Sequence, residues 1–280
     1  MSEQNLIEVR DLAVEFVTGD QAHRVVNGIS FDIRKGETLA LVGESGSGKS
    51  VTAHSLLRLL PYPLARHPSG SILYEGKDLL QQNEKTMQRI RGNRIAMIFQ
   101  EPMTSLNPLH CIEKQINEIL LLHKGLTGKE ATARTLELLE MVGIPEPRKR
   151  LKALPHELSG GQRQRVWIAM VLAQETPLML LDEPCTFLDL SHQIGLLELL
   201  RRLNRQEHRT MVAVLHDLNQ ACRYADHLVV MREGQIVTQG APNDIVDAAL
   251  IERVFDLPCR IIPDPVAGSP MIVPLGAESL

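Results

Sequence analysis

The stretch that decides the fold is Gly43-Glu44-Ser45-Gly46-Ser47-Gly48-Lys49-Ser50. It matches the pattern GxxxxGK[ST], whose glycines let backbone N–H groups converge on phosphate oxygens. Thr38 to Val42, just before it, is an apolar run typical of a buried parallel strand, and Ser50 to Leu60 after it has helical periodicity. A strand, a glycine-rich loop and a helix in this order predict a nucleotide site. Lys49 would bridge the β- and γ-phosphates, and the Ser50 hydroxyl would bind Mg²⁺.

The alternative interpretation of this stretch is a flexible Gly/Ser turn without a ligand. At average residue usage such a motif arises by chance in about one chain in 100 of this length or fewer. The strand before it and the helix after it favour nucleotide binding.

Two adjacent carboxylates follow a second apolar run, Leu178 to Leu181. A buried strand ending there places Asp182 where it can hold Mg²⁺ through water. Glu183 would then polarise an attacking water as a general base. Taken without the glycine-rich loop, the same pair could be ordinary solvated acids at a strand end.

A second glycine-rich loop precedes a predicted helix from Arg163 to Ala173. It consists of Ser159, Gly160, Gly161 and Gln162. The loop can capture an anion at a helix N-terminus, through the Ser159 hydroxyl and backbone N–H groups. The same residues also make a good helix-entry turn, so the loop is informative mainly through its position between the other motifs.

The composition narrows the class of protein. With 280 residues, 44% hydrophobic and 23% charged, the chain is globular. The formal net charge of −4 and an aromatic content of 3% argue against a general nucleic-acid binder. Four scattered cysteines without a CxxC pair, and no signal peptide, predict reduced thiols in a cytosolic protein. The longest apolar run, Val166 to Ala173, is too short to cross a membrane.

Strands and helices outside these motifs are also predicted. Leu6 to Phe16 and Arg24 to Ile33 are expected to be edge strands. Residues from about Thr104 to Lys152 are expected to form a helical subdomain. Two helices are predicted in this stretch, at Glu113 to Leu122 and Glu130 to Val142. Farther along the chain, helices are predicted at Gln193 to Leu203 and Asn219 to Tyr224, and a strand at Met211 to Leu215. A hairpin closed by Glu233 and Gly234 is predicted to join His227 to Met231 with Gln235 to Val237.

The order of these motifs resembles an ABC-transporter ATPase over essentially the whole chain. The motif LSGGQ, Leu158 to Gln162, lies between the phosphate loop and Leu181-Asp182-Glu183-Pro184, which is a highly specific arrangement. The resemblance implies an α/β P-loop NTPase core with an antiparallel β subdomain and an inserted helical subdomain at about 104–157. A single cassette at 1–257 and a C-terminal tail at 258–280 are then expected.

The resemblance also assigns roles to single residues. Gln100 would contact Mg²⁺ and couple to the membrane subunit, and His216 would contact the γ-phosphate. Asp189 belongs to the D-loop pair Leu188-Asp189, and Phe16 would stack on adenine. A strand-end histidine and a core phenylalanine are the simpler alternatives for His216 and Phe16.

The partners that the resemblance implies are membrane permease subunits and a second ATPase subunit, with ATP and Mg²⁺ as cofactors and no nucleic acid. The Ser159 loop of one copy would close over the nucleotide of the other. The protein is expected at the cytoplasmic face of the cell membrane, as a peripheral subunit. The rival interpretation is a soluble ABC ATPase of DNA repair or translation. Such proteins tend to carry two cassettes or a long coiled coil.

The two halves of the chain resemble different importers. Phe99 to Pro108 is similar to ATPases that energise uptake of oligopeptides, dipeptides or nickel. Trp167 to Thr176, Leu215 to Ala221 and Asp264 to Pro270 resemble ATPases of ferric-siderophore importers. Cys185 stands where the family usually has Thr or Ser. The sequence thus predicts an importer of peptides or nickel, with a siderophore importer as the alternative.

Overall fold

The computed structural model describes residues 5–100, 106–186 and 188–276. The chain divides into two compact units. The first unit comprises Met1–Met87 and Thr210–Leu280, and the second comprises Gln88–Arg209. The second unit is therefore an insertion in the sequence of the first, and it is larger than the predicted helical subdomain.

The first unit contains an antiparallel sheet with strand order β2-β1-β4-β5. Its strands are β1 (Asn5–Thr18), β2 (Gln21–Arg34), β4 (Ala65–Tyr74) and β5 (Lys77–Asp78). The two long strands extend beyond the predicted ranges. Strand β2 is an edge strand, as predicted, whereas β1 pairs with both β2 and β4 and is therefore an interior strand, so the prediction of an edge strand at Leu6 to Phe16 is wrong. The buried residues of β1 include Ile7 and Val9 at 0% exposure, and Leu12 to Val14 are buried in a row.

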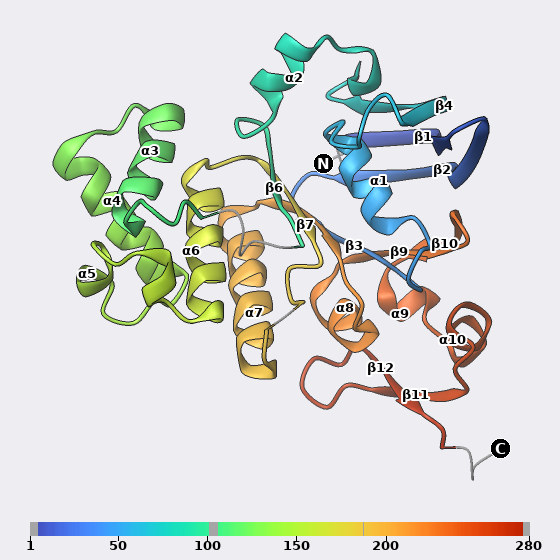
Figure 1. The fold of residues 1–280 in the computed structure, drawn as a ribbon. Helices are drawn as coiled ribbons and strands as arrows, with labels where there is room; N and C mark the ends of the chain where they lie inside the picture. Colours follow the sequence, from blue (N-terminus) through green and yellow to red (C-terminus); the bar gives the residue numbers. More distant parts are fainter. Residues whose placement is uncertain (1–4, 101–105, 187, 277–280) are drawn as a thin grey trace. The chain divides into compact units, whose positions relative to one another are not determined.

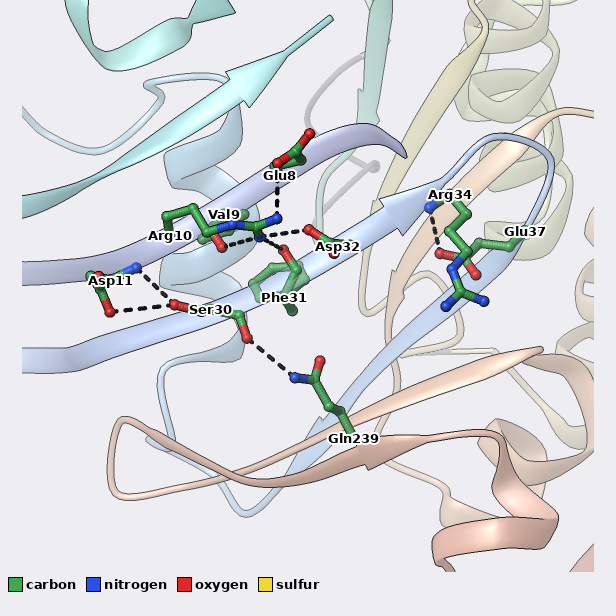
Figure 2. A network of polar contacts seen from close by, with 10 residues as sticks. All are labelled: Glu8, Val9, Arg10, Asp11, Ser30, Phe31, Asp32, Arg34, Glu37 and Gln239. Atoms are coloured by element: carbon green, nitrogen blue, oxygen red, sulfur yellow. Dashed lines mark hydrogen bonds and ion pairs between the residues drawn. The ribbon is translucent and has the colours of Figure 1, made fainter. Parts of the chain in front are cut away.

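Polar contacts fix how β1 and β2 pair (Figure 2). The Arg10 guanidinium on β1 contacts the Glu8 carboxylate at 2.8 Å and the Asp32 carboxylate on β2 at 2.6 Å. The Asp11 N–H donates to Ser30 Oγ at 2.9 Å, and Gln239 Nε2 donates to the Ser30 carbonyl at 3.3 Å. The contacts of Arg10 with Asp32 and of Asp11 with Ser30 join the two strands and help to set their register, because a slip by one residue would break both.

The phosphate-loop strand β3 (Thr38–Gly43) belongs to the other sheet of the first unit. It pairs in parallel with β8 (Thr210–Val214) and with β9 (His227–Arg232). The next strand, β10 (Gln235–Gly240), pairs antiparallel with β9. Glu233 and Gly234 join the two with φ of 49° and 74°, as in a two-residue hairpin turn of the I′ kind. The predicted hairpin is confirmed.

The helix after the phosphate loop, α1 (Lys49–Leu56), ends earlier than the predicted Leu60. Arg58 adopts a left-handed conformation with φ 52°. The Arg58 N–H donates to the Ser55 carbonyl at 3.1 Å, and the Leu59 N–H donates to the His54 carbonyl at 3.0 Å. These bonds satisfy the last carbonyls of the helix, so it stops before a proline is reached.

The second unit combines a parallel strand pair with helices (Figure 1). Strand β6 (Ile95–Ile98) pairs with β7 (Leu178–Asp182). The two helices predicted in the inserted stretch are confirmed, and Gly125 ends the first of them with φ 69°. The helices of this unit are α3 (Ile112–Lys124), α4 (Gly128–Met141), α5 (Pro147–Arg150), α6 (Gly160–Ala173) and α7 (Leu190–Glu207).

Helix α2 (Glu84–Ile90) contains the boundary between the two units in the sequence. The remaining elements belong to the C-terminal part of the first unit. The predicted tail contains a hairpin, in which β11 pairs with β12. Asn219 on α8 holds this hairpin by two hydrogen bonds to the backbone of Ile272, of 2.7 and 3.2 Å. These elements are α8 (Leu218–Tyr224), α9 (Pro242–Ile245), α10 (Ala248–Phe255), β11 (Cys259–Pro263) and β12 (Pro270–Pro274). Within the described residues, every helix is too short or too polar to cross a bilayer.

Candidate functional site

Lys49 is folded back into the glycine-rich loop of the first unit. Its side chain is 4% exposed, and Nζ donates to the carbonyls of Gly43 and Glu44 at 2.9 and 2.7 Å. A contact of 3.4 Å to Ser47 Oγ completes this set. The ammonium is thus held at the centre of the loop, as a phosphate-binding lysine must be.

Two glycines of the loop are required by its geometry. Gly43 has φ 151°, and a Cβ on it would lie 2.1 Å from the Met231 carbonyl oxygen. Gly48 has φ 95° and is the N-cap of α1, the position from which the first helical N–H groups point outward. Glu44, Ser45 and Gly46 between them are exposed, so the loop offers its backbone to solvent while its base is buried.

His216 follows β8, at the same edge as the loop. Leu41 on β3 is paired with Val214 on β8, and two residues farther along each strand lie Gly43 and His216. Because parallel strands end at one edge of a sheet, this register places the exposed histidine at the loop edge. Phe16 is half-buried on β1, opposite His23 and Ala65, and its adenine-stacking role stays a prediction.

The second unit brings Gln100 and Glu183 together. Gln100 Nε2 donates to Glu183 Oε2 at 2.6 Å. The reason lies in the pairing of Ile98 with Leu181, since both site residues come two positions after that pair. Asp182, the last residue of β7, is only 3% exposed. The strand end therefore holds one buried carboxylate next to one that a glutamine orients.

Glu183 has features that the sequence does not reveal. Its φ is 50°, a left-handed conformation that turns the chain sharply after the strand. Thr186 Oγ1 donates to Glu183 Oε2 at 3.3 Å, and the Gln164 side chain on α6 donates to the Pro184 carbonyl. Thr186 and Gln164 therefore support the site, and only the position of Thr186 three residues after Glu183 hints at this in the sequence.

The second glycine-rich loop is already part of a helix. Ser159 is the N-cap of α6, and Gly160, Gly161 and Gln162 form its first turn rather than preceding it. The Gln162 N–H donates to Ser159 Oγ at 3.3 Å, and the Ser159 N–H donates to Gln162 Oε1 at 3.1 Å. This reciprocal cap fixes the loop, and the exposed Ser159 and Gly160 lie at the N-terminus of a 14-residue helix.

Asp189 caps the next helix, α7. It is exposed, and its Oδ1 accepts the backbone N–H of His192 at 2.9 Å. Hydrogen bonds from His192 and Ser191 hold the pKa of the Asp189 carboxyl below its usual value. Half-buried Cys185 accepts a hydrogen bond from Gln193 Nε2 on its carbonyl oxygen, at 3.2 Å, so its backbone is anchored to α7.

Residues 26–186 match a family model described as ABC transporter. The chain belongs to the ABC transporter family. It is an ATP-binding cassette of the ATPase kind, as its order of motifs predicts. The confirmed fold is the mixed α/β one, with an antiparallel sheet and a helical part.

Several relatives of this cassette are named as transport ATP-binding proteins. It is 57% identical over 242 residues to the peptidoglycan transport ATP-binding protein YejF of Agrobacterium fabrum, covering 86% of this chain and 44% of that protein. It is 48% identical over 240 residues to the oligopeptide transport ATP-binding protein OppD of Bacillus subtilis, covering 86% of this chain and 67% of that one. Compared with YejF, the chain thus spans less than half of its relative's length.

A solved dimeric structure of MJ0796, a bacterial ABC transporter cassette, covers 84% of this chain and 98% of that one. The TM-score is 0.74 at 26% identity. The same cassette has also been solved as a dimer in a post-hydrolysis state bound to ADP and Pi.

The comparisons do not support the siderophore-like interpretation of the second half. The alignments with YejF and OppD, at 242 and 240 residues, are too long to stop near residue 157. They include most of the half that resembles siderophore ATPases.

Proposed function

We propose that this cassette is the ATP-hydrolysing subunit of an importer that energises peptide uptake through a membrane permease. The orientation of Glu183 by Gln100, next to the buried Asp182, is the observation that carries the hydrolytic part. The peptide part is supported by relatives whose names denote oligopeptide, dipeptide or peptidoglycan transport. Nickel and siderophores have no such support among these relatives.

In this proposal the glycine-rich loop binds the phosphates of ATP. Residues Gly43 to Gly48 supply backbone N–H groups. The Lys49 ammonium leaves the loop carbonyl oxygens that it contacts and binds phosphate oxygens in their place. Phe16 contributes an aromatic face to the adenine. The support is the buried Lys49 ammonium, which is held by loop carbonyl oxygens that the charged oxygens of a phosphate can replace as stronger acceptors.

The donor set fits Mg²⁺. Ser50, Asp182 and Gln100 offer a hydroxyl, a carboxylate and an amide oxygen, which are the hard oxygen ligands that this ion prefers. Among the described residues, no cluster of three His, Cys, Asp or Glu side chains could cage a metal. When bound, Mg²⁺ would neutralise charge on the β- and γ-phosphates.

Glu183 is proposed as the general base. Gln100 orients the carboxylate, and Glu183 accepts the proton of the attacking water. His216, exposed at the loop edge, is proposed to donate a hydrogen bond to the γ-phosphate as negative charge builds up on its oxygens.

A second subunit is proposed to complete the site. Ser159, Gly160 and Gly161 of one copy would cover the nucleotide of the other, and Asp189 would contact the same interface. The exposed, capped N-terminus of α6 supports this role, because backbone N–H groups at a helix N-terminus attract phosphate. The dimers solved for MJ0796 also support it.

The permease is proposed to contact the second unit. A cavity of about 960 Å³ opens between α3 and α4, in the inserted helical stretch. Its lining includes Lys114 and Glu118 of opposite charge and the 54% exposed Leu121. A rim of charges around an exposed leucine is the composition expected of a docking surface. The protein would then lie at the cytoplasmic face of the cell membrane, as a peripheral subunit.

Reconstitution with a peptide-type, a nickel-type or a siderophore-type permease tests this function. We expect ATPase stimulation and transport with the peptide type. Leu121→Asp should lower the stimulation about 10-fold while basal hydrolysis stays unchanged, as expected for an interface anchor. Leu122→Asp is the matched control, since Leu122 is 76% exposed on the same helix but does not line the cavity. Stimulation by the siderophore permease in place of the peptide type would refute the peptide assignment.

A further inference from the structure

His192 touches two loops at once. It lies in the first turn of α7, and its ring Nδ1 is 2.5 Å from the Asp189 carboxylate oxygen that also accepts its backbone N–H. The ring therefore cannot rotate without losing a strong contact to the cap residue. This contact fixes the direction in which the other edge of the ring points.

That other edge lies against the N-terminus of α6. The residues Ser159 to Gln162 at this N-terminus are called the signature loop below. A Cβ on Gly161 would be 3.1 Å from His192 Cδ2 and 3.3 Å from Nε2, which is closer than Cβ atoms normally approach. Gly161 is thus the residue type that lets the ring come this near. The space that remains around these residues is about 10 Å³, at the lower limit for one water molecule. The short distances from the Cβ position of Gly161 show that the ring and Gly161 are closely packed.

The other charged group that lines this small cavity is engaged elsewhere. Arg165 of α6 donates from Nη1 to the Gly143 carbonyl at 2.7 Å. The ring of His192 is 37% exposed and takes its orientation from Asp189. Asp189, His192 and Gly161 form a short chain of contacts from the N-terminus of α7 to that of α6.

We propose that His192 is a positioning residue that couples Asp189 to the signature loop, so that the two move together when the ATP-bound dimer closes. The inference rests on the proposed function, in which both loops meet the second subunit. A loop shift at Asp189 would be transmitted through the ring to Gly161, because closely packed groups move together. Hydrolysis would gain from this coupling, whereas binding of ATP to the loop of an isolated copy would not.

Two substitutions separate the two contacts of the ring. His192→Asn keeps an amide donor where Nδ1 lies but removes the ring edge beside Gly161. His192→Phe keeps a ring beside Gly161 but cannot donate to Asp189. We expect each to lower kcat about 5- to 10-fold, as expected for loss of a typical coupling between sites, and to lower the Hill coefficient for ATP. KM and ATP affinity of the isolated monomer should not change.

Ser191→Ala is the matched control. It removes the 3.1 Å hydrogen bond from Ser191 Oγ to the same Asp189 oxygen, without touching Gly161. We expect near-normal cooperative hydrolysis. In a Glu183→Gln background, both His192 variants should accumulate less ATP-bound dimer than the control does, which size-exclusion chromatography measures.

The outcomes are distinct. A normal kcat and Hill coefficient in His192→Asn would mean that His192 only supports the cap of α7 through Asp189. The same result in His192→Phe would mean that the ring only fills space beside Gly161. Either result overturns the coupling. In both cases, cooperative hydrolysis by the unmodified protein would leave the proposed function intact. Failure of the unmodified protein to hydrolyse ATP at all would refute the proposed function itself.

Discussion

Replacement of Glu183 by glutamine is the sharpest test of the hydrolytic site. The two side chains have the same shape, and the oxygen that accepts from Gln100 at 2.6 Å and from Thr186 at 3.3 Å can be kept. The substitution keeps these hydrogen bonds but removes the negative charge that strengthens them. We therefore expect it to lower the free energy of unfolding by no more than about 1 kcal/mol. Loss of a general base, in contrast, lowers the rate about 100- to 10,000-fold.

These magnitudes separate folding from catalysis. The rate loss corresponds to about 3–5 kcal/mol in the activation free energy. Steady-state phosphate release should therefore fall by at least two orders of magnitude, while the urea midpoint moves little and ATP still binds. Thr186→Val removes the longer of the two hydrogen bonds and should cost a few-fold at most. Hydrolysis by Glu183→Gln within about 10-fold of the unmodified rate would refute the assignment of the base.

Three further outcomes are expected. Ser159→Arg should leave ATP affinity of an isolated monomer nearly unchanged, measured by calorimetry, but should abolish cooperative hydrolysis; a loss of monomer affinity would place this loop at the wrong nucleotide. Lys49→Ala should lose ATP affinity in monomer and dimer alike, because the ammonium is proposed to bind the phosphates directly; unchanged affinity would contradict the phosphate-loop assignment. Burial raises the pKa of the Cys222 thiol from 9.0 to about 11, so its contribution to stability is complete below pH 9 and is lost as the pH rises toward 11. The urea midpoint should fall over that range, by less in Cys222→Ala, and equal falls in the two proteins would contradict the cause.

Local rules predict the strand, the glycine-rich loop and the hairpin at Glu233-Gly234, since each depends on residues a few positions apart. The same rules misplace two helix boundaries. Helix α1 ends at Leu56 because Arg58 takes a left-handed conformation, which side-chain type does not reveal in a non-glycine residue. Helix α6 begins at Gly160 because the Ser159–Gln162 cap satisfies its first N–H groups, although glycine is a poor helix former.

Contacts between distant residues could be predicted only through the family resemblance. Gln100 and Glu183 are 83 positions apart, and neither composition nor periodicity relates them. The contact of His192 with Gly161 depends on how two helices begin side by side, which only the structure shows. The resemblance of the second half to siderophore ATPases rests on three short stretches, and the comparisons with known proteins leave it unsupported.

The register of parallel strands explains why His216 lies near the glycine-rich loop and why Gln100 lies near Glu183. Leu41 pairs with Val214 in the first unit and Ile98 with Leu181 in the second, and in each case the chemistry lies two residues beyond the pair. Parallel pairing aligns residues at equal distances past the pair, so the contact between Gln100 and Glu183 follows from register and not from the length of chain between them. A helical stretch of variable length can therefore be inserted after β6 without disturbing the site. The surface of the insertion can then change while the strands that carry the proposed hydrolytic residues keep their pairing.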